Sequence, residues 1–386
     1  MNYDIVVIGG GIHGAGVAQA AAAGGYSVLL LEKNSIASGT SSRSSKLIHG
    51  GLRYLESAQF GLVRESLHER ETLLRIAPTL VRRVNFFIPV YASTLRRPWK
   101  IRAGLSLYAL LGGGARGTGF KTLARTRWHE LDGLDTRGLQ CVFQYQDAQT
   151  DDVALTQAVV RSAQTLGAQI ECGADFLAGT RHDAGFEVRY RHANDEKNCR
   201  AGVLVNAAGP WVNTVLERIS PRPSQLAVDL VQGSHILLEG EIRQGIYYIE
   251  APSDRRAVFV MPWKGKTLVG TTETAFDGDA DALHPRPQEI IYLQETLRRY
   301  FPQASGSLIA SFAGLRVLPR ASGSLFHRSR ETTLHADTTE RARLITIYGG
   351  KLTGYRATAT KVMQRLKTSL PATTTRANTA HIMLSA

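Results

Sequence analysis

The chain has 386 residues, of which 43% are apolar and 20% charged, so its composition excludes a fibrous or disordered protein and predicts one large domain or two smaller ones. The three cysteines, Cys141, Cys172 and Cys199, are widely spaced without a C-x-x-C pair, which argues against a disulfide framework and a zinc or other metal site. We therefore expect a reducing, cytoplasmic compartment. The formal net charge of +13 is compatible with binding to a nucleic acid, to an anionic membrane surface or to a small anionic substrate, and it can also serve solubility alone.

Targeting and membrane-spanning segments are not expected. Asp4 stands where a secretory leader has its basic segment, and the apolar run after it ends in glycines. The longest apolar candidate, residues 103–111, is shorter than the ~18 residues that a membrane-spanning helix needs.

The N-terminus is typical of a dinucleotide-binding turn. Residues 3–8 form a short β-branched run that predicts a buried strand, and a G-x-G-x-x-G motif follows it. The first glycine permits a tight turn, the second lets the backbone approach a pyrophosphate, and the third keeps the next helix, predicted over residues 14–24, against the sheet. A second strand, predicted at 27–31, ends at Glu32, whose carboxylate can accept hydrogen bonds from ribose hydroxyls. The three glycines are Gly9, Gly11 and Gly14.

Three later segments favour FAD over NAD. Residues 37–53 are rich in hydroxyls and glycines and can wrap a pyrophosphate and reach a flavin; the alternative is a solvated linker, against which the embedded Leu47-Ile48 argues. Residues 203–209 form a strand that runs into small residues, as a close backbone approach requires. A strand at 344–348 leads into a glycine turn and a helix to about residue 370, whose partly positive N-terminus, with Lys351, would stabilise the anion of a reduced flavin.

With these motifs the sequence resembles the FAD-dependent glycerol-3-phosphate dehydrogenases, within the wider family that includes D-amino-acid and sarcosine oxidases. Bacterial members of that group usually continue into a further helical C-terminal domain, which is absent from these 386 residues. The matching stretches spread over almost the whole chain: residues 40–42 and 44–56, Asn206–Val212, Gly233–Ile236, Gly270–Glu273, Gly314–Arg316, Gly349–Thr353 and Tyr355-Arg356.

The resemblance implies an α/β fold, with a Rossmann-like FAD-binding domain and an antiparallel-sheet α+β substrate domain, as in D-amino-acid oxidase. We expect a discontinuous FAD-binding domain over residues 1–90, 145–220 and 325–370. Residues 91–144 and 221–324 would form the substrate domain, with strands at 233–238, 247–249, 257–262 and 266–270 and a hairpin turn at 263–265. The Thr- and Ala-rich residues 371–386 would be a loose tail.

The resemblance also implies a site and a reaction. FAD would oxidise sn-glycerol 3-phosphate to dihydroxyacetone phosphate, with hydride passing from C2 to flavin N5 and electrons going on to a quinone. A base must take the hydroxyl proton, and since arginine stays protonated, His49 and His235 are the candidates, with His49 preferred. Lys351 would act beside the flavin, and the dianionic substrate would be bound by Arg53, Tyr54, Arg316 and Arg330. The cofactor would be bound by Gly9, Gly11, Gly14, Glu32, Thr40, Ser41, Ser42, Lys46, Gly50, Gly51, Ala208, Gly209, Gly350, Lys351 and Thr353.

Two other functions stay open. The first is a flavoenzyme of the same fold that oxidises an amino acid or a 2-hydroxy acid, which needs one carboxylate clamp rather than several cations. The second is an RNA-associated or non-catalytic FAD-binding protein, although we find no basic stripe interleaved with aromatics and expect no nucleic-acid partner. The basic residues 96–102, with Trp99, precede the apolar residues 105–111, so this segment is either a peripheral contact with the cytoplasmic face of a membrane or a buried helix with a basic start.

Overall fold

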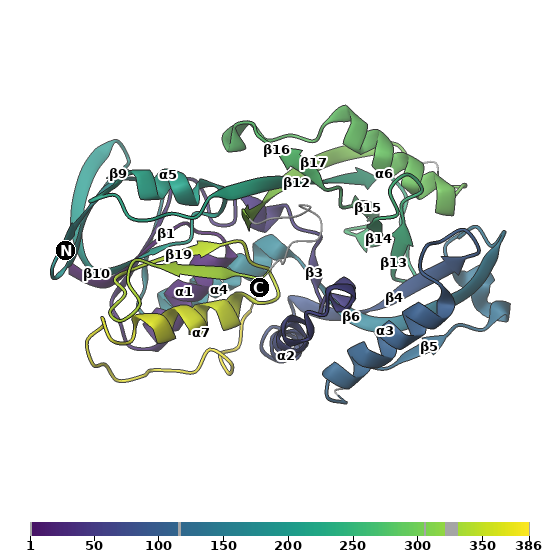
Figure 1. The fold of residues 1–386 in the computed structure, drawn as a ribbon, viewed down its shortest axis with the longest axis horizontal. Helices are drawn as coiled ribbons and strands as arrows, with labels where there is room; N and C mark the ends of the chain where they lie inside the picture. The colour runs from purple at the N-terminus through teal and green to yellow at the C-terminus, as the bar shows by residue number, and fades with distance from the viewer. Residues whose placement is uncertain (1, 115–116, 305, 321–330, 386) are drawn as a thin grey trace.

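The computed structural model describes residues 2–114, 117–304, 306–320 and 331–385, which form two sheets side by side in an elongated molecule (Figure 1). The first sheet, at the left of Figure 1, contains both ends of the dinucleotide-binding motif. The second sheet, at the right, is built from the middle of the chain.

The first sheet has a parallel centre, in which β1 lies between β2 and β10, and β7 and β19 pair with β2 and β10. Successive residues of β1 and β2 are buried on both faces, which is why these strands read as unbroken apolar runs. The strands are β1 (Asn2–Ile8), β2 (Val28–Glu32), β7 (Gln169–Cys172), β8 (Ala174–His182), β9 (Gly185–His192), β10 (Asp195–Asn206), β11 (Ile219–Ser220), β18 (Thr333–Ala336) and β19 (Leu344–Tyr348).

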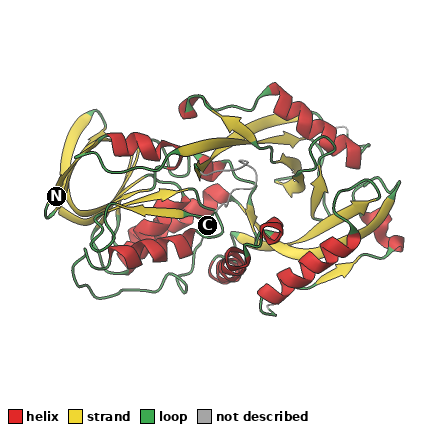
Figure 2. Ribbon diagram, viewed as in Figure 1, coloured by secondary structure: helices red, strands yellow, loops and turns green. Residues whose placement is uncertain are grey.

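Helices cover both faces of this sheet (Figure 2). Ile5 and Val7 of β1 face α1 (Ile12–Ala23) and α7 (Tyr355–Leu366), and α4 (Asp152–Thr165) packs beside α1. Val6 faces the opposite side, where α5 (Val212–Glu217) packs. Small residues let α1 lie close to the sheet: a Cβ at Gly14 would come within 1.9 Å of the Gly9 carbonyl oxygen. The strands predicted at 3–8, 27–31 and 344–348 and the helix between the first two are confirmed.

The second sheet is antiparallel except where β13 pairs in parallel with β4. The predicted hairpin joins β14 and β15, with Lys264 and Gly265 at φ +50° and +74°. Its strands are β3 (Leu47–Ile48), β4 (Val81–Tyr91), β5 (Phe120–Thr122), β6 (Leu139–Thr150), β12 (Val228–Leu238), β13 (Ile246–Glu250), β14 (Ala257–Trp263), β15 (Lys266–Gly270), β16 (Thr274–Phe276) and β17 (Leu308–Pro319), and its helices are α2 (Phe60–Ile76), α3 (Pro98–Leu111) and α6 (Pro287–Tyr300). The 3-10 helices are η1 (Thr40–Ser42), η2 (Leu52–Ser57), η3 (Arg125–Glu130), η4 (Gly209–Trp211) and η5 (Ala280–Ala282).

The structure departs from two expectations about the parts of the chain. Strands β3 and β4 fall in the range 1–90, expected in the FAD-binding part, yet both pair in the second sheet with β6. The tail also lacks helix and strand over 371–385 but is not loose: the backbone N–H groups of Arg376 and Leu384 donate to Ala23 and Ile76. Carbonyl groups at helix ends need such partners, and α1 and α2 end at these two positions.

Over the part of the chain that the structure describes, no helix is both long and apolar enough to cross a membrane.

Candidate active site

A cavity of about 870 Å³ opens between the two sheets and gathers most of the residues predicted for the site. Lys46, Gly50, Ser42 and Gly14 do not line it, and Arg330 lies outside the described residues. The predicted residues that line the cavity are Gly9, Gly11, Glu32, Thr40, Ser41, His49, Gly51, Arg53, Tyr54, Ala208, Gly209, His235, Arg316, Gly350, Lys351 and Thr353.

The glycine turn leaves a backbone surface at one wall of the cavity. Gly9 has φ +106°, and a Cβ there would come within 2.6 Å of the Ala207 carbonyl oxygen, so only glycine fits. The Ser41 hydroxyl accepts from the Ile12 N–H (2.9 Å) at the start of α1 and lines the same wall. The partly positive N-terminus of a helix therefore meets the cavity, as the binding of a pyrophosphate requires.

Glu32 is buried and already holds the turn. Its two carboxylate oxygens accept from the N–H groups of Gly10 (2.6 Å) and Asn34 (2.8 Å). A carboxylate has about four acceptor positions, so the side chain can still accept from a ribose hydroxyl at the cavity wall.

The predicted cofactor residues outside the cavity hold its loops from behind. The Lys46 ammonium lies 2.8 Å from both carboxylate oxygens of Asp152, which is fully buried at the start of α4. The Ser42 hydroxyl donates to the Gly39 carbonyl (3.0 Å), and the Gly50 N–H donates to the Tyr108 hydroxyl (2.8 Å). These contacts position the loop rather than provide free groups that face the cavity.

A buried charge pair supports the loop at residues 49–54. The Tyr108 hydroxyl donates to Asp147 (2.7 Å), whose other oxygen pairs with Arg70 (2.6 Å). Arg70 is fully buried, and burial raises the pKa of the Asp147 carboxyl against the opposing effect of Arg70. Removing one member of such a pair would leave an uncompensated buried charge, so the pair is held in place. Through the Tyr108 hydroxyl, which accepts from the Gly50 N–H, it fixes the backbone beneath the site.

Cationic side chains meet at the end of the cavity shared by the two sheets. Arg53 and Arg316 both contact the same carboxylate oxygen of Glu273, at 3.3 and 3.4 Å, and Arg316 also donates to the Thr271 hydroxyl (3.2 Å). The Lys351 ammonium lies 3.8 Å from the centre of the Tyr54 ring. Three positive side chains thus lie around one carboxylate, an arrangement that suits an anionic group such as a phosphate.

The two candidate bases have different surroundings. His235 is buried, stacks on Phe312 (4.9 Å between centroids) and shares a hydrogen bond with the Ser45 hydroxyl (3.0 Å). The His49 N–H of the backbone donates to Thr353 (3.1 Å), which joins its loop to the 349–353 turn. Burial lowers the pKa of both imidazoles to about 3, and nearby cations add to the effect: Lys351 and Arg53 at His49, Arg316 and Lys46 at His235. Both rings are therefore neutral at pH 7, the form that can take a proton.

Sequence reasoning assigned no role to three polar groups of the site. Glu273 joins the two arginines, Ser45 contacts His235, and Glu289 accepts hydrogen bonds from Gln232, Ser234, Thr272 and Thr274 behind the loop that carries Glu273. Glu273 and Ser45 lie inside the matching motifs, so their place in those runs was the available signal. Glu289 lies in α6, outside every motif, and only the folded chain identifies it.

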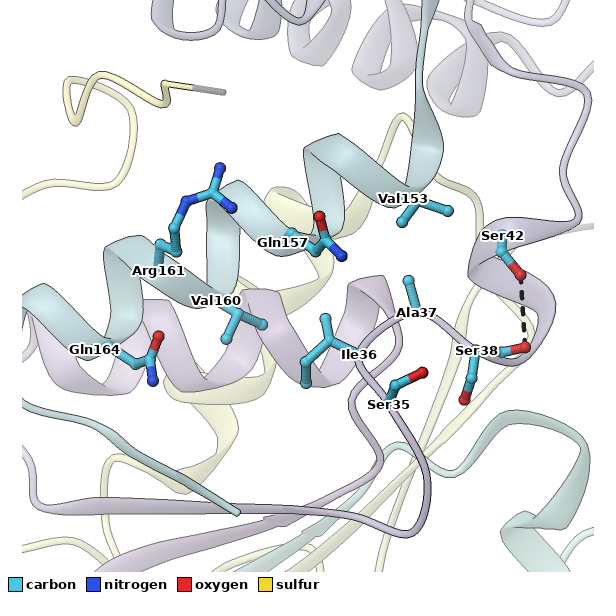
Figure 3. A pocket seen from close by; sticks show the side chains of 10 residues that line it. All are labelled: Ser35, Ile36, Ala37, Ser38, Ser42, Val153, Gln157, Val160, Arg161 and Gln164. Carbon is cyan, nitrogen blue, oxygen red and sulfur yellow. Dashed lines mark hydrogen bonds between the residues drawn. The ribbon is translucent and has the colours of Figure 1, made fainter. Parts of the chain in front are cut away.

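A second hollow of about 490 Å³ lies between α4 and the loop after β2 (Figure 3). Val153, Gln157 and Arg161 line it from the helix, and Ser35 to Ser38 line it from the loop. Gln157 and Arg161 are exposed, so this hollow is an open surface groove, and it contains none of the predicted catalytic residues.

Comparison with known proteins identifies the family. The model of the family "FAD dependent oxidoreductase" matches residues 4–356. The chain belongs to this family. It is 38% identical over 378 residues to D-erythritol 1-phosphate dehydrogenase of Brucella abortus, covering 95% of this chain and 74% of that protein. Its identity to glycerol-3-phosphate dehydrogenase of Pseudomonas aeruginosa is 37% over 372 residues, 95% of this chain and 72% of that one.

A solved structure supports the same assignment. Glycerol-3-phosphate dehydrogenase from Bacillus halodurans, complexed with FAD, superimposes with a TM-score of 0.76 at 28% identity, over 100% of this chain and 68% of that one. The predicted fold and the FAD cofactor are confirmed. The residues of this FAD oxidoreductase fit the cofactor: the glycine turn would be filled by a Cβ, and the Trp211 indole N–H is buried at the cavity wall without a partner among the described residues.

Proposed function

We propose that this FAD oxidoreductase oxidises a phosphorylated polyol, with sn-glycerol 3-phosphate as the substrate and dihydroxyacetone phosphate as the product. The observation that carries the proposal is the pair Arg53 and Arg316, held by one carboxylate beside Lys351 at the cavity wall. D-Erythritol 1-phosphate is a second candidate substrate, because a dehydrogenase with that name is 38% identical over 95% of the chain. Both molecules offer the same phosphate and a secondary alcohol.

Each residue of the site has a proposed task. Arg53 and Arg316 bind the phosphate with their planar guanidinium groups, and Tyr54 packs against Lys351 and orients the chain of the substrate. His49 takes the hydroxyl proton, with His235 as the alternative base. A bound dianion neutralises the cations that help to lower the histidine pKa, so the base becomes stronger when substrate is present. FAD supplies the hydride acceptor.

The electron acceptor in this proposal is a quinone, which the protein reaches by lying on an anionic membrane surface. Support comes from α3, where Trp99 and Leu110 are 72% and 75% exposed, and from the exposed basic residues Arg97, Lys100 and Arg102 around Trp99 at the start of this helix. Arg96 does not belong to this surface, because its side chain is only 19% exposed and pairs with Glu56 (2.9 Å) and Glu250 (3.4 Å), whereas Lys100, which also contacts Glu56 (3.5 Å), is 53% exposed.

Anaerobic titration of the purified, FAD-loaded protein tests the proposal. Glycerol 3-phosphate should bleach the flavin absorbance, free glycerol should not at the same concentration, and erythritol 1-phosphate serves as the competing arm. Bleaching by an amino acid or a 2-hydroxy acid, with no response to either phosphate, would overturn the assignment and favour the carboxylate-clamp alternative.

A further inference from the structure

His13 is a half-buried histidine that the predicted mechanism does not use. It is the second variable residue between Gly11 and Gly14, on the first turn of α1, and it lines the large cavity. Both of its ring nitrogens are buried, and neither has a hydrogen-bond partner within the described parts of the chain. Its Nε2 faces the 349–353 turn so closely that a Cβ on Gly350 would come within 2.0 Å of it.

The chemistry of the ring makes this arrangement costly for the protein alone. Burial lowers the pKa of His13 to about 4, so at pH 7 the ring is neutral, with one N–H donor and one acceptor nitrogen. A buried polar group without a partner is unfavourable, and native proteins satisfy the large majority of such groups. Because the ring lines the cavity, a molecule that fills the cavity can supply the missing partner.

The position of His13 indicates which part of that molecule it meets. Gly350, against which its ring packs, precedes Lys351, whose ammonium lies on the Tyr54 ring at the proposed polyol site. The glycine turn and the Ser41 cap directly precede His13, at the start of α1. His13 thus follows the turn that suits a pyrophosphate, and its ring packs against the 349–353 turn beside the proposed substrate site.

We propose that His13 is a cofactor-binding residue that hydrogen-bonds the flavin half of FAD and so contributes to both the affinity and the reduction potential of the cofactor. The proposal depends on FAD binding, which the family shows, and not on the identity of the polyol. In this chain the dinucleotide motif would thus bind FAD through the His13 side chain as well as through its backbone.

The test is His13→Leu, which removes both ring nitrogens and puts an apolar side chain of similar length in their place. We expect the FAD dissociation constant, measured by fluorescence titration of the apoprotein, to rise ~10- to 100-fold. The melting temperature of the apoprotein should rise at the same time, because an unsatisfied group is gone, whereas that of the loaded protein should fall. The flavin reduction potential, measured by dye equilibration, should shift as well.

Tyr355→Phe is the matched control. The Tyr355 hydroxyl is also buried without a partner among the described residues, but the ring of Tyr355 packs on α1 at Gly16 and does not line the cavity. Its removal should raise the melting temperature of both forms and leave the FAD dissociation constant unchanged.

His13→Gln keeps a donor and an acceptor and should restore most of the affinity, and this comparison decides the matter even if the leucine variant does not fold. A glutamine variant that binds FAD as weakly as the leucine or a methionine variant would overturn the proposal. So would an unchanged dissociation constant and potential in His13→Leu, or an equal loss of melting temperature in both forms, which marks a purely structural histidine.

Discussion

Arg316 offers the sharpest test of the proposed substrate. The residue lies on β17, donates to Thr271 (3.2 Å) and pairs with Glu273 (3.4 Å), and its side chain is 25% exposed at the cavity. In Arg316→Ala one charge-assisted bond to the substrate phosphate is lost, and such a bond contributes roughly 1.5–3 kcal/mol. Because ~1.4 kcal/mol is a factor of ten, kcat/KM for the phosphorylated substrate should fall about 10- to 150-fold.

The same variant separates substrate binding from other roles. Arg316→Lys should recover only part of the rate, since the lysine ammonium lacks the planar fork that binds two phosphate oxygens. FAD content and any weak oxidation of free glycerol should stay close to those of the wild type, because neither involves the phosphate. Steady-state kinetics with glycerol 3-phosphate and glycerol measure both effects.

Arg320→Ala is the matched control, because this arginine directly follows β17 but is 64% exposed and pairs with Asp229 at the surface (3.2 Å). Its loss should change stability by no more than about 0.5 kcal/mol and leave kcat/KM unchanged. Equal losses of rate on glycerol and glycerol 3-phosphate in Arg316→Ala would refute the reasoning, because Arg316 would then support the fold or the flavin.

Three further predictions follow from the turn, the histidines and α3. Gly11→Val should abolish FAD retention, read as flavin absorbance after purification, because a Cβ there already meets the Ser41 hydroxyl at 3.1 Å, whereas Gly61→Ala, in open space, should retain it. The pKa of His235 is lowered from 6.5 to about 3, so the unfolded chain binds more protons and the unfolding free energy should fall by ~1.4 kcal/mol per pH unit below pH 6.5; urea unfolding at pH 7, 6 and 5 should show a shallower slope in His235→Gln. Neutralising the three exposed cations around the start of α3 should weaken the binding free energy to anionic vesicles by ~1 kcal/mol per charge, measured by sedimentation with neutral vesicles as the control, and a wild type that never sediments contradicts the membrane proposal. These cations are Arg97, Lys100 and Arg102.

Local patterns predicted the parts of the fold whose causes are local. The sequence predicted β1 from the β-branched run before the glycines, α1 from its small residues, and the end of β2 from its acid. It could do so because strand burial and tight turns depend on neighbouring residues. The hairpin at Lys264-Gly265 could also be predicted from the sequence, because two neighbouring residues with positive φ form its turn. The motifs also identified most of the residues that line the large cavity.

The tertiary structure decided which groups face one another. Glu273 lies 220 residues from Arg53 and 43 from Arg316, so no local pattern could predict that it pairs with both. Lys46 was expected at the cofactor but is held by Asp152, 106 residues away, and β4 joined the second sheet because it pairs along its length with β6. Sequence alone determined the kind of cofactor and gave candidates for the residues that bind it. Their pairing depended on how the two sheets meet, because charges and hydrogen bonds act over a few ångströms in space whatever their separation along the chain.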